Sequence, residues 1–317
     1  MQTPWGELRV SDAHVHFFSH SFFQSFARQS KRPLEALGAS LGWQIPPPEP
    51  RALAGSWVQE LDRHGIHRAA LIASIPGDED SVAAAVAAFP GRFFGYFMFN
   101  PAAPDAAERL QRALASDALQ AVCLFPAMHR YSVHDARVRP VFELAAARPG
   151  TAVFLHCGVL SLGIRKKLGL PSPFDMRFSN PIDLHAVALE FPGLNFVIPH
   201  FGAGYFREAL MLCDLCPNVH LDTSSSNSWM RYEPAGIDLK TVFRRALDVA
   251  GAERLLFGTD SSFFPRGWQS DIFQAQAQAL GELGIGAAAA ARIFSENLER
   301  LLTRAAHGPP APPEPPS

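Results

Sequence analysis

The sequence is poor in the features that mark several large classes of protein. It has 4 cysteines in 317 residues, too few for a disulfide framework in a chain of this length. Its formal net charge is −2 and its basic residues form no long run, so neither a nucleic acid nor an anionic membrane surface is indicated as a partner. No apolar run is long enough to span a bilayer, and the first residues lack the apolar segment of a secretory signal. We therefore expect a cytoplasmic protein with a small-molecule substrate. The protein could form a homodimer.

Two of the cysteines, Cys213 and Cys216, form a C-x-x-C pair. No second pair of cysteines or histidines lies near them, as a structural zinc site would require. We expect both to be ordinary residues on the half-buried face of a helix.

Short runs of β-branched and aromatic residues alternate with longer segments rich in alanine and leucine. The runs predict strands at residues 7–16, 68–75, 93–100, 121–125, 152–157, 195–201, 219–224 and 255–260. In the segments between them, such as SVAAAVAAFP and DAAERLQRALAS, apolar residues recur at helical spacing. This alternation favours a parallel sheet covered by helices, and eight units favour a closed (β/α)8 TIM barrel.

An open, doubly wound sheet is the alternative architecture. The first strand of a dinucleotide-binding sheet would be followed by a glycine-rich turn, but here Phe17 and Phe18 occupy that place. We therefore predict one α/β barrel domain over residues 1–306, with two additions. Residues 17–50, rich in aromatics and ending in PPPEP, are expected to form a long loop without ordinary helix that covers the active face. Residues 307–317 form a proline-rich tail that we expect to be disordered.

Potential metal ligands stand at the ends of the predicted strands. His14 and His16 are two residues apart, so on an extended strand they share one face. His156, His200 and Asp260 each close a further strand, and the carboxyl ends of barrel strands form the active face. A lone H-x-H is a weak signal, because histidines often lie in protein cores, but three further donors at strand ends strengthen it. Imidazole nitrogens with a carboxylate suit one divalent metal ion, best Zn²⁺, while Mn²⁺, Fe²⁺ or Co²⁺ would also fit.

From about Val10 to Leu302 the sequence resembles the amidohydrolase-related family of TIM-barrel metal-dependent hydrolases, which includes enzymes similar to aminocarboxymuconate-semialdehyde decarboxylase. The motifs that carry the resemblance are D-x-H-x-H at residues 12–16, LHCG at His156, PHFG at His200, LDTS at Asp222, FGTD at Asp260 and the closing IFSENLERLL. They are specific for the superfamily and not for a substrate.

The resemblance implies that His14, His16, His156 and Asp260 bind the metal and that His200 holds or polarises the water or the substrate. Asp12 is expected to support these ligands. Many relatives carry a lysine on strand four, and binuclear members of the wider superfamily use a carbamylated lysine or a glutamate there to bridge two metals, whereas this sequence has Cys123. Because a cysteine cannot form that carbamate, one metal ion is favoured, with a Cys123 thiolate ligand as the minor alternative.

The favoured function is hydrolysis of an ester, lactone or amide carbonyl by metal-activated water. Asp260 would then transfer the proton and His200 would stabilise the oxyanion. Two alternatives stay open: non-oxidative decarboxylation of an aromatic or unsaturated acid, and a metal-binding scaffold whose chemistry has lapsed.

Residues of the predicted top loops are candidates for contact with the substrate. Arg177, Arg266 and Arg231 could grip a carboxylate, and Trp229 could contact the substrate. The loop at residues 158–180 is long and basic, as a lid would be. An aromatic pocket, or alternatively aromatic packing on the barrel rim, would use Phe17, Phe23, Trp229, Phe264 and Trp268.

Overall fold

The computed structural model describes residues 1–224, 228–233 and 237–303. Its core is an eight-stranded parallel sheet in which the strands follow one another in chain order. The strands are β3 (Ser11–Phe17), β4 (Arg68–Ala73), β5 (Phe93–Phe99), β6 (Ala121–Leu124), β7 (Ala152–Leu155), β8 (Asn195–Ile198), β9 (Val219–Asp222) and β10 (Leu255–Leu256). All eight predicted strands are thereby confirmed, although the first begins at Ser11. The residues before it form a small hairpin of β1 (Gln2–Thr3) and β2 (Gly6–Glu7).

Contacts between the first and last strands close the sheet into a barrel. Val15 forms a parallel bridge with Ser261. The backbone N–H groups of Ala13 and His16 donate to Phe257 and Ser261 at 2.8 and 2.7 Å, and that of Asp260 donates to His14 at 3.0 Å. The TIM barrel is confirmed, and the open sheet was the wrong alternative because the edges of this sheet pair with each other.

The strands are apolar at nearly every position because both of their faces are covered. Side chains such as Tyr96, Cys123 and Phe154 fill the barrel interior. Their neighbours, such as Phe97 and Val122, face outward and pack beneath the surrounding helices. All seven residues of β5 are buried, as expected for a parallel strand between two apolar layers.

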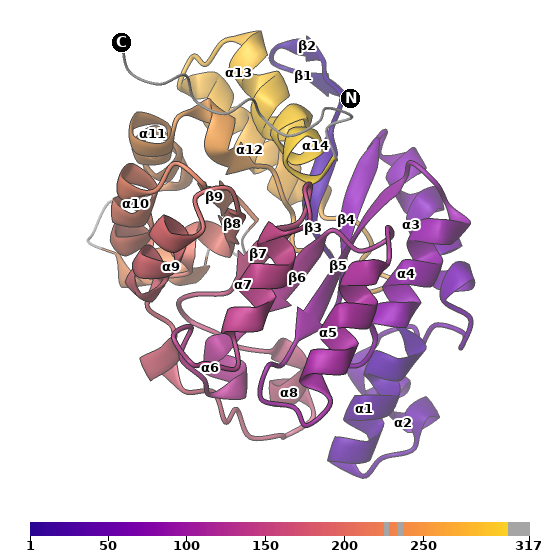
Figure 1. Ribbon diagram of the computed structural model, residues 1–317. Coiled ribbons are helices and arrows are strands. Elements are labelled where there is room, and N and C mark those ends of the chain that lie inside the picture. Colours follow the sequence, from indigo (N-terminus) through magenta and orange to yellow (C-terminus); the bar gives the residue numbers. More distant parts are fainter. Residues whose placement is uncertain (225–227, 234–236, 304–317) are drawn as a thin grey trace.

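The helices surround this sheet (Figure 1). They are α3 (Pro50–Arg63), α4 (Glu79–Ala88), α5 (Ala106–Ala115), α6 (Pro126–His129), α7 (Arg139–Ala146), α9 (His185–Glu190), α10 (Phe206–Leu215), α11 (Leu239–Ala250), α12 (Ser270–Glu282), α13 (Ala287–Ala291) and α14 (Asn297–Leu302). Cys213 lies on α10 and Cys216 caps it, both fully rather than half buried, and all four cysteines are free.

The segment from residue 17 to residue 50 differs from the prediction, since it contains α1 (His20–Ser30) and α2 (Leu34–Leu41). The Ser19 side chain caps α1 by accepting a hydrogen bond from the backbone of Phe22. Pro33 lies at the N-cap of α2, where a proline does not interrupt the helix. The proline-dense stretch itself is not helical, and α3 begins at its last proline, Pro50.

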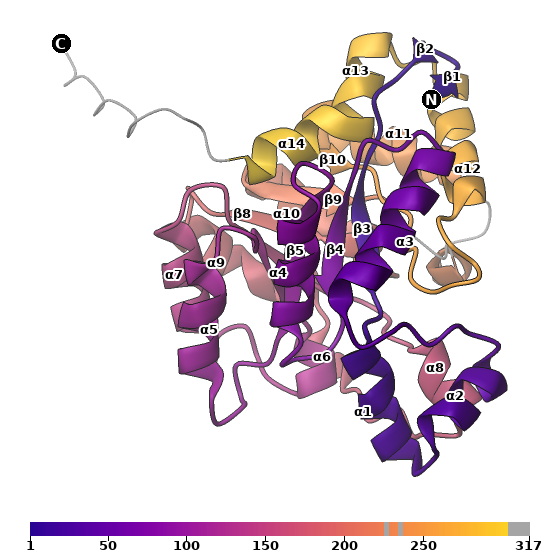
Figure 2. The same ribbon diagram turned by 90° about the vertical axis from the view of Figure 1, so that its right-hand side faces the viewer.

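These two helices pack against α8 (Gly163–Lys167) from the predicted basic loop, and the three are called the roof below. They share a small apolar core of Phe22, Phe23, Phe26, Leu37, Leu41, Ile164 and Leu168. Figure 2 shows the roof at one end of the barrel, with α13, α14 and the hairpin at the other. The roof lies beyond the carboxyl ends of the strands, where we expected a cover.

The structure also bears on the two ends of the expected architecture. The tail predicted at residues 307–317 lies outside the described residues. In the described ranges, no helix has the length and apolar character needed to cross a membrane.

Candidate active site

Three predicted metal ligands converge at the carboxyl end of the barrel. His14 Nε2 lies 3.3 Å from His16 Nε2 and 3.7 Å from Asp260 Oδ1, and His16 Nε2 lies 3.3 Å from the same carboxylate oxygen. Among the described residues, these three side chains form the group able to hold a metal ion. The structure thus brings together donors from the first strand and from the loop after the last, because barrel closure makes them neighbours.

The far nitrogen of each ligand histidine is held by a partner that fixes the ring. His14 Nδ1 lies 2.6 Å from Asp222 Oδ2, and His16 Nδ1 lies 2.8 Å from Ser74 Oγ. Ser74 donates its own hydroxyl proton to the backbone carbonyl of Ile72, so it can only accept from His16. Both rings therefore carry the proton on Nδ1 when neutral, and Nε2 presents a lone pair to Asp260.

This arrangement fits a cation. Two lone pairs and a carboxylate oxygen face one another at 3.3–3.7 Å, and they repel unless a proton or a metal ion lies among them. Burial raises the pKa of Asp260, but when a proton rather than a metal ion lies among these atoms, the hydrogen bond with His16 and the charge of His14 oppose this effect, and the pKa ends below its usual range. Asp260 is thus an anion at neutral pH. Two imidazole nitrogens and one carboxylate are the donor set of many catalytic zinc sites.

Asp12 fixes the backbone that carries these ligands. One of its carboxylate oxygens accepts hydrogen bonds from the backbone N–H groups of His14 and Thr259, at 2.9 and 3.1 Å. The other accepts from the Thr259 hydroxyl at 2.5 Å and from Trp268 Nε1 at 2.8 Å. Burial raises the pKa of Asp12 to about 6. As expected, Asp12 supports the ligands and does not join them.

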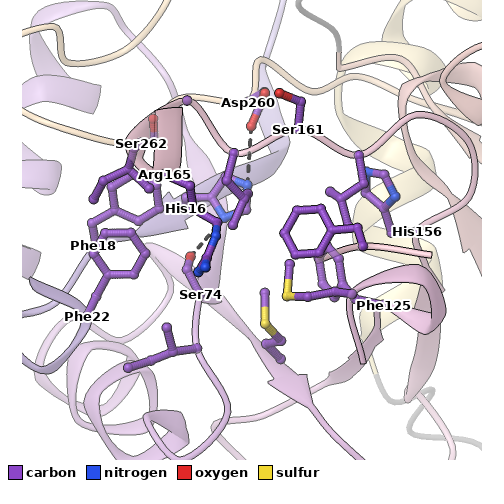
Figure 3. A pocket seen from close by; sticks show the side chains of 18 of the residues that line it. His16, Phe18, Phe22, Ser74, Phe125, His156, Ser161, Arg165, Asp260 and Ser262 are labelled. Carbon is purple, nitrogen blue, oxygen red and sulfur yellow. Dashed lines mark hydrogen bonds and ion pairs between the residues drawn. The ribbon is translucent and has the colours of Figure 1, made fainter. Parts of the chain in front are cut away.

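His156 lies at the same mouth but is not one of the three converging side chains. Its ring stacks on Phe125 at 5.2 Å and meets the edge of His200 at 5.5 Å. In Figure 3 it lies beside Phe125, on the opposite side of His16 from Phe18 and Phe22. Its Nδ1 is buried without a hydrogen-bond partner among the described residues, and burial lowers its pKa well below the usual value. A buried neutral nitrogen of this kind can offer a lone pair, and its place in the ligand set stays a prediction.

His200 points its Nδ1 away from the cavity. That atom lies 2.7 Å from the backbone carbonyl of Ser224, which can only accept, so Nδ1 carries a proton. Because burial lowers the pKa of His200, its neutral ring leaves a lone pair on Nε2. A neutral His200 thus accepts a hydrogen bond, and it could stabilise an oxyanion only when protonated.

The two residues predicted to be catalytic share an uncommon backbone conformation. His200 has φ 56° and Asp260 has φ 59°, both in the left-handed region that residues other than glycine seldom adopt. Such conformations cost on the order of 1–2 kcal/mol each and concentrate at functional sites. Hydrogen bonds from Gln269 and Arg266 to the Asp260 carbonyl, at 3.1 and 3.3 Å, help to hold one of them.

Two glycines of the sequence motifs are required by close approach. A Cβ on Gly158 of LHCG would lie 2.2 Å from the carbonyl oxygen of Gly202 in PHFG, and Gly158 also has φ +77°. A Cβ on Gly258 of FGTD would lie 2.7 Å from Asp222 Oδ1 and 3.0 Å from the Cβ of His14. The motif loops can therefore pack against each other only with glycine at these places.

A cavity of about 770 Å³ opens above the ligands and beneath the roof. It is lined by the predicted site residues His14, His16, His156, His200, Asp260, Trp229 and Arg266. Its other aromatic lining residues are Phe18, Phe22, Phe26, Trp43, Phe125, Phe174, Tyr232 and Phe263. The pocket is aromatic, as proposed, but only Trp229 of the five predicted aromatics lines it.

The other predicted aromatics lie elsewhere for identifiable reasons. Phe17 is fully buried in the core, and the next residue, Phe18, turns to the cavity. Phe23 belongs to the apolar core of the roof, and Trp268 binds Asp12. Phe264 packs on Trp57 at 4.9 Å.

The predicted arginines divide in the same way. Arg266 and Arg231 line the cavity. Burial lowers the pKa of Arg266, whose guanidinium lies 4.5 Å from the ring of Phe263. Arg177 is not brought to the cavity, since its side chain is 83% exposed and pairs with Asp175.

Cys123 lies in the barrel interior and does not belong to the group of converging ligands. It is wholly buried among apolar side chains, and burial raises the pKa of its thiol well above the usual value. A thiol that stays protonated is a poor ligand. The site thus has no strand-four group that bridges two ions, within the described part of the chain.

Sequence reasoning missed the residues that orient the histidines. Asp222, Ser224 and Ser74 had no assigned role, although Asp222 and Ser224 belong to the LDTS motif. Ser224 Oγ lies 2.8 Å from His14 Nδ1 and 3.1 Å from His200 Nδ1, so it joins the two rings. Position at a strand end was the available signal for Asp222, and no comparable signal marks Ser74.

Known proteins share both the sequence pattern and this fold. The model of the amidohydrolase family matches residues 11–304. Protein fluG of Emericella nidulans is 29% identical over 162 residues, which are 50% of this chain and 17% of fluG. The chain therefore matches only a small part of the length of that relative.

Two solved structures resemble the whole barrel. A probable 2-pyrone-4,6-dicarboxylic acid hydrolase from Acinetobacter baumannii, with citric acid bound, has a TM-score of 0.59 and 14% identity, covering 93% of this chain and 99% of its own. A 5-carboxyvanillate decarboxylase from Novosphingobium aromaticivorans, with bound manganese, has a TM-score of 0.61 and 15% identity, covering 93% and 97%. At such identities the likeness shows the fold alone.

Proposed function

The chain belongs to the amidohydrolase family, and on this basis we propose that it is a metal-dependent hydrolase acting on an ester, lactone or amide bond of a small molecule. The observation that carries the proposal is the convergence of His14, His16 and Asp260 beneath a cavity of about 770 Å³. The cavity is large enough for a small organic molecule, and the ligands lie in its wall.

The metal would be held by His14, His16 and Asp260, with His156 as a further ligand, and zinc suits these donors best. When bound, a divalent ion lowers the pKa of a water towards about 7 and polarises a carbonyl oxygen. Asp222 and Ser74 keep the two histidine rings in the tautomer that binds. Manganese, as in the decarboxylase structure, would also be accommodated by nitrogen and oxygen donors.

Two side chains would handle the proton. The Asp260 carboxylate lies among the predicted ligands, so it would take a proton from the attacking water and pass it to the leaving group. His200 presents the lone pair of Nε2, so it can orient that water by accepting a hydrogen bond. Stabilisation of an oxyanion, the role expected of His200 from the sequence, would require a protonated ring, whereas orientation of water requires only the neutral form.

Decarboxylation is the second candidate, favoured by the arginines in the cavity wall. Arg266 lies next to the Asp260 loop, and its guanidinium could hold a carboxylate near the ligands. The same ligand set would then serve protonation of a carbon instead of attack by water. Release of CO₂ separates the two reactions.

The test is turnover of ester, lactone, amide and carboxylic-acid panels before and after chelation. We expect hydrolysis that is lost with the metal and restored by Zn²⁺ or Mn²⁺. Release of CO₂ without hydrolysis would replace the proposal with the decarboxylase. A protein that binds metal and turns over none of these compounds would contradict both reactions and favour the lapsed scaffold.

A further inference from the structure

The cavity extends away from the metal ligands along α1. The ring of Phe18 lies 5.5 Å from that of His16, at the inner end. Phe22, Phe26 and Gln29 then line the cavity at spacings of three and four residues, which place them on one face of the helix. At 1.5 Å per residue, the distance along α1 from Phe22 to Gln29 is roughly 10 Å. The cavity therefore has an outer end well separated from the reacting centre.

The wall between the two ends consists of stacked aromatic rings. Phe22 lies over Phe18 at 4.0 Å with an interplanar angle of 4°, and Trp43 lies over Phe263 at 4.0 Å and 15°. Phe18 and Trp43 join the two pairs at 5.9 Å. Rings that lie parallel in this way present flat, apolar surface, which suits a planar ring of the substrate.

The outer end carries positive charge. Arg28 of α1 and Arg165 of α8 both line the cavity there. Arg165 donates from Nε to the Pro171 carbonyl at 2.7 Å and from Nη1 to Gln29 Oε1 at 2.8 Å. Both acceptors are neutral, so they fix the guanidinium without cancelling its charge.

Neither arginine has an acidic partner among the described residues. Elsewhere in the chain, Arg109 is paired with the buried Glu79 at 2.9 Å, as a structural arginine commonly is. Among the described residues that line the cavity, Asp260 is the one with a carboxylate, and it lies at the inner end. A fixed guanidinium facing a cavity with no carboxylate nearby is suited to bind an anion from outside the chain.

We propose that the substrate is an elongated, ring-bearing acid whose carboxylate binds Arg165, assisted by Arg28, at the outer end of the cavity. Its ring lies along the aromatic wall, and its reactive carbonyl reaches His16 and Asp260. A carboxylate fits better than a compact anion because the planar guanidinium can bind two oxygens side by side. This inference rests on the proposed function and deepens it, since it names the class of substrate.

The test compares two ligands that differ at one end only. The monoamide and the diamide of terephthalic acid share the ring and one amide, but the diamide has a second neutral amide in place of the carboxylate. Binding to the metal-loaded, full-length protein is followed by tryptophan fluorescence, which Trp43 in the cavity wall should report. We expect the monoamide to bind about tenfold tighter than the diamide, as a charge-assisted hydrogen bond implies.

Variants show whether Arg165 causes the preference for the ligand with the carboxylate. Arg165→Gln should reduce the tenfold difference to less than threefold, because the fixed guanidinium is gone. Lys166→Gln is the matched control, since it removes the same charge from the next residue of α8, which is exposed and outside the cavity. If Arg165→Gln does not fold, Arg165→Lys takes its place in the test. Lysine keeps the charge but loses the planar fork of the guanidinium. The ratio of the two affinities should then lie between the tenfold value of the unaltered protein and the threefold value expected for Arg165→Gln.

Several results would overturn the inference. The first is equal binding of the two ligands by the unaltered protein. The second is a folded Arg165 variant that still prefers the ligand with the carboxylate by the full tenfold. Tighter binding of 4-carbamoylphenylphosphonate than of the monoamide would replace the carboxylate with a phosphate-like group. Because binding needs no turnover, metal-dependent hydrolysis without this preference contradicts the inference alone. The preference without any turnover contradicts the proposed function alone.

Discussion

The floor and the roof of the cavity are built on different physical principles. The floor, at the strand ends, is a buried polar network in which Asp12, Asp222 and Ser224 fix the ligand histidines by hydrogen bonds. The roof is held by apolar packing and stacked rings, with few polar contacts to the barrel. Hydrogen bonds impose direction, whereas apolar contacts tolerate exchange of one side chain for another. The floor should therefore determine the reaction, and the roof the choice of substrate.

The strongest expected effect separates chemistry from binding within the floor. Asp260→Asn removes the base but keeps the side-chain size, so kcat should fall by about 10²- to 10⁴-fold. Turnover is measured beside metal content, which shows whether the ion is still bound. Activity equal to that of the unaltered protein would remove Asp260 from the mechanism.

The next effect tests whether the partners of the histidines matter. Asp222→Asn takes away the carboxylate that holds His14 Nδ1, and the affinity for the metal should fall by about 10- to 100-fold. Titration with Zn²⁺ in a competing chelator measures it. Asp214→Asn, on the exposed side of α10, is the control and should leave the affinity unchanged. Equal losses in both variants would show that the network has no special role.

A variant in the aromatic wall beneath the roof should act on substrate binding and spare the chemistry. Trp43→Ala removes one ring of the aromatic wall, so KM should rise by roughly three- to tenfold. We expect kcat and metal content to stay near those of the unaltered protein, and Trp43→Phe to restore most of the loss. A fall in kcat with unchanged KM would mean that the division between floor and roof is wrong.

The smallest expected effect concerns the stability of the strand beneath the floor. Burial lowers the pKa of His220 on β9 to about 3, so the folded chain binds this proton only in strong acid. The unfolded chain binds it below about 6.5, and stability is therefore lost as the pH falls from there towards 3. Between pH 8 and pH 6 this loss is about 0.8 kcal/mol.

Urea unfolding of the unaltered protein and of His220→Gln at the two pH values measures this effect. The unaltered protein should lose about 0.8 kcal/mol of unfolding free energy relative to His220→Gln when the pH falls from 8 to 6. A constant difference would show that the proton of His220 is not linked to folding.

The sequence predicted the floor better than the roof, for physical reasons. Strand ends in a closed barrel meet at one face, so His14, His16 and Asp260 could be placed together without coordinates. The orienting partners were missed because a hydrogen bond such as that between Ser74 and His16 depends on side-chain direction. Beneath the roof, the choice between Phe17 and Phe18 depended on which of these two adjacent residues turns to the cavity.

Two further differences between prediction and structure also arise because the sequence does not show the direction of a side chain. The prolines near residue 50 led to a prediction of loop for a segment where Phe22, Phe23 and Phe26 form the buried face of α1. Arg177 and Arg165 lie in the same basic loop, and only the fold shows that the first pairs with Asp175 while the second faces the cavity.

The most direct test of the account is the metal content of the purified chain after dialysis, measured by mass spectrometry of the elements. We predict one divalent ion per chain, lost in His16→Ala and kept in Cys123→Ala. Two results would contradict a single metal site on the floor of the cavity. One is that the unaltered protein holds no ion after loading with Zn²⁺ or Mn²⁺, and the other is that it holds two ions per chain.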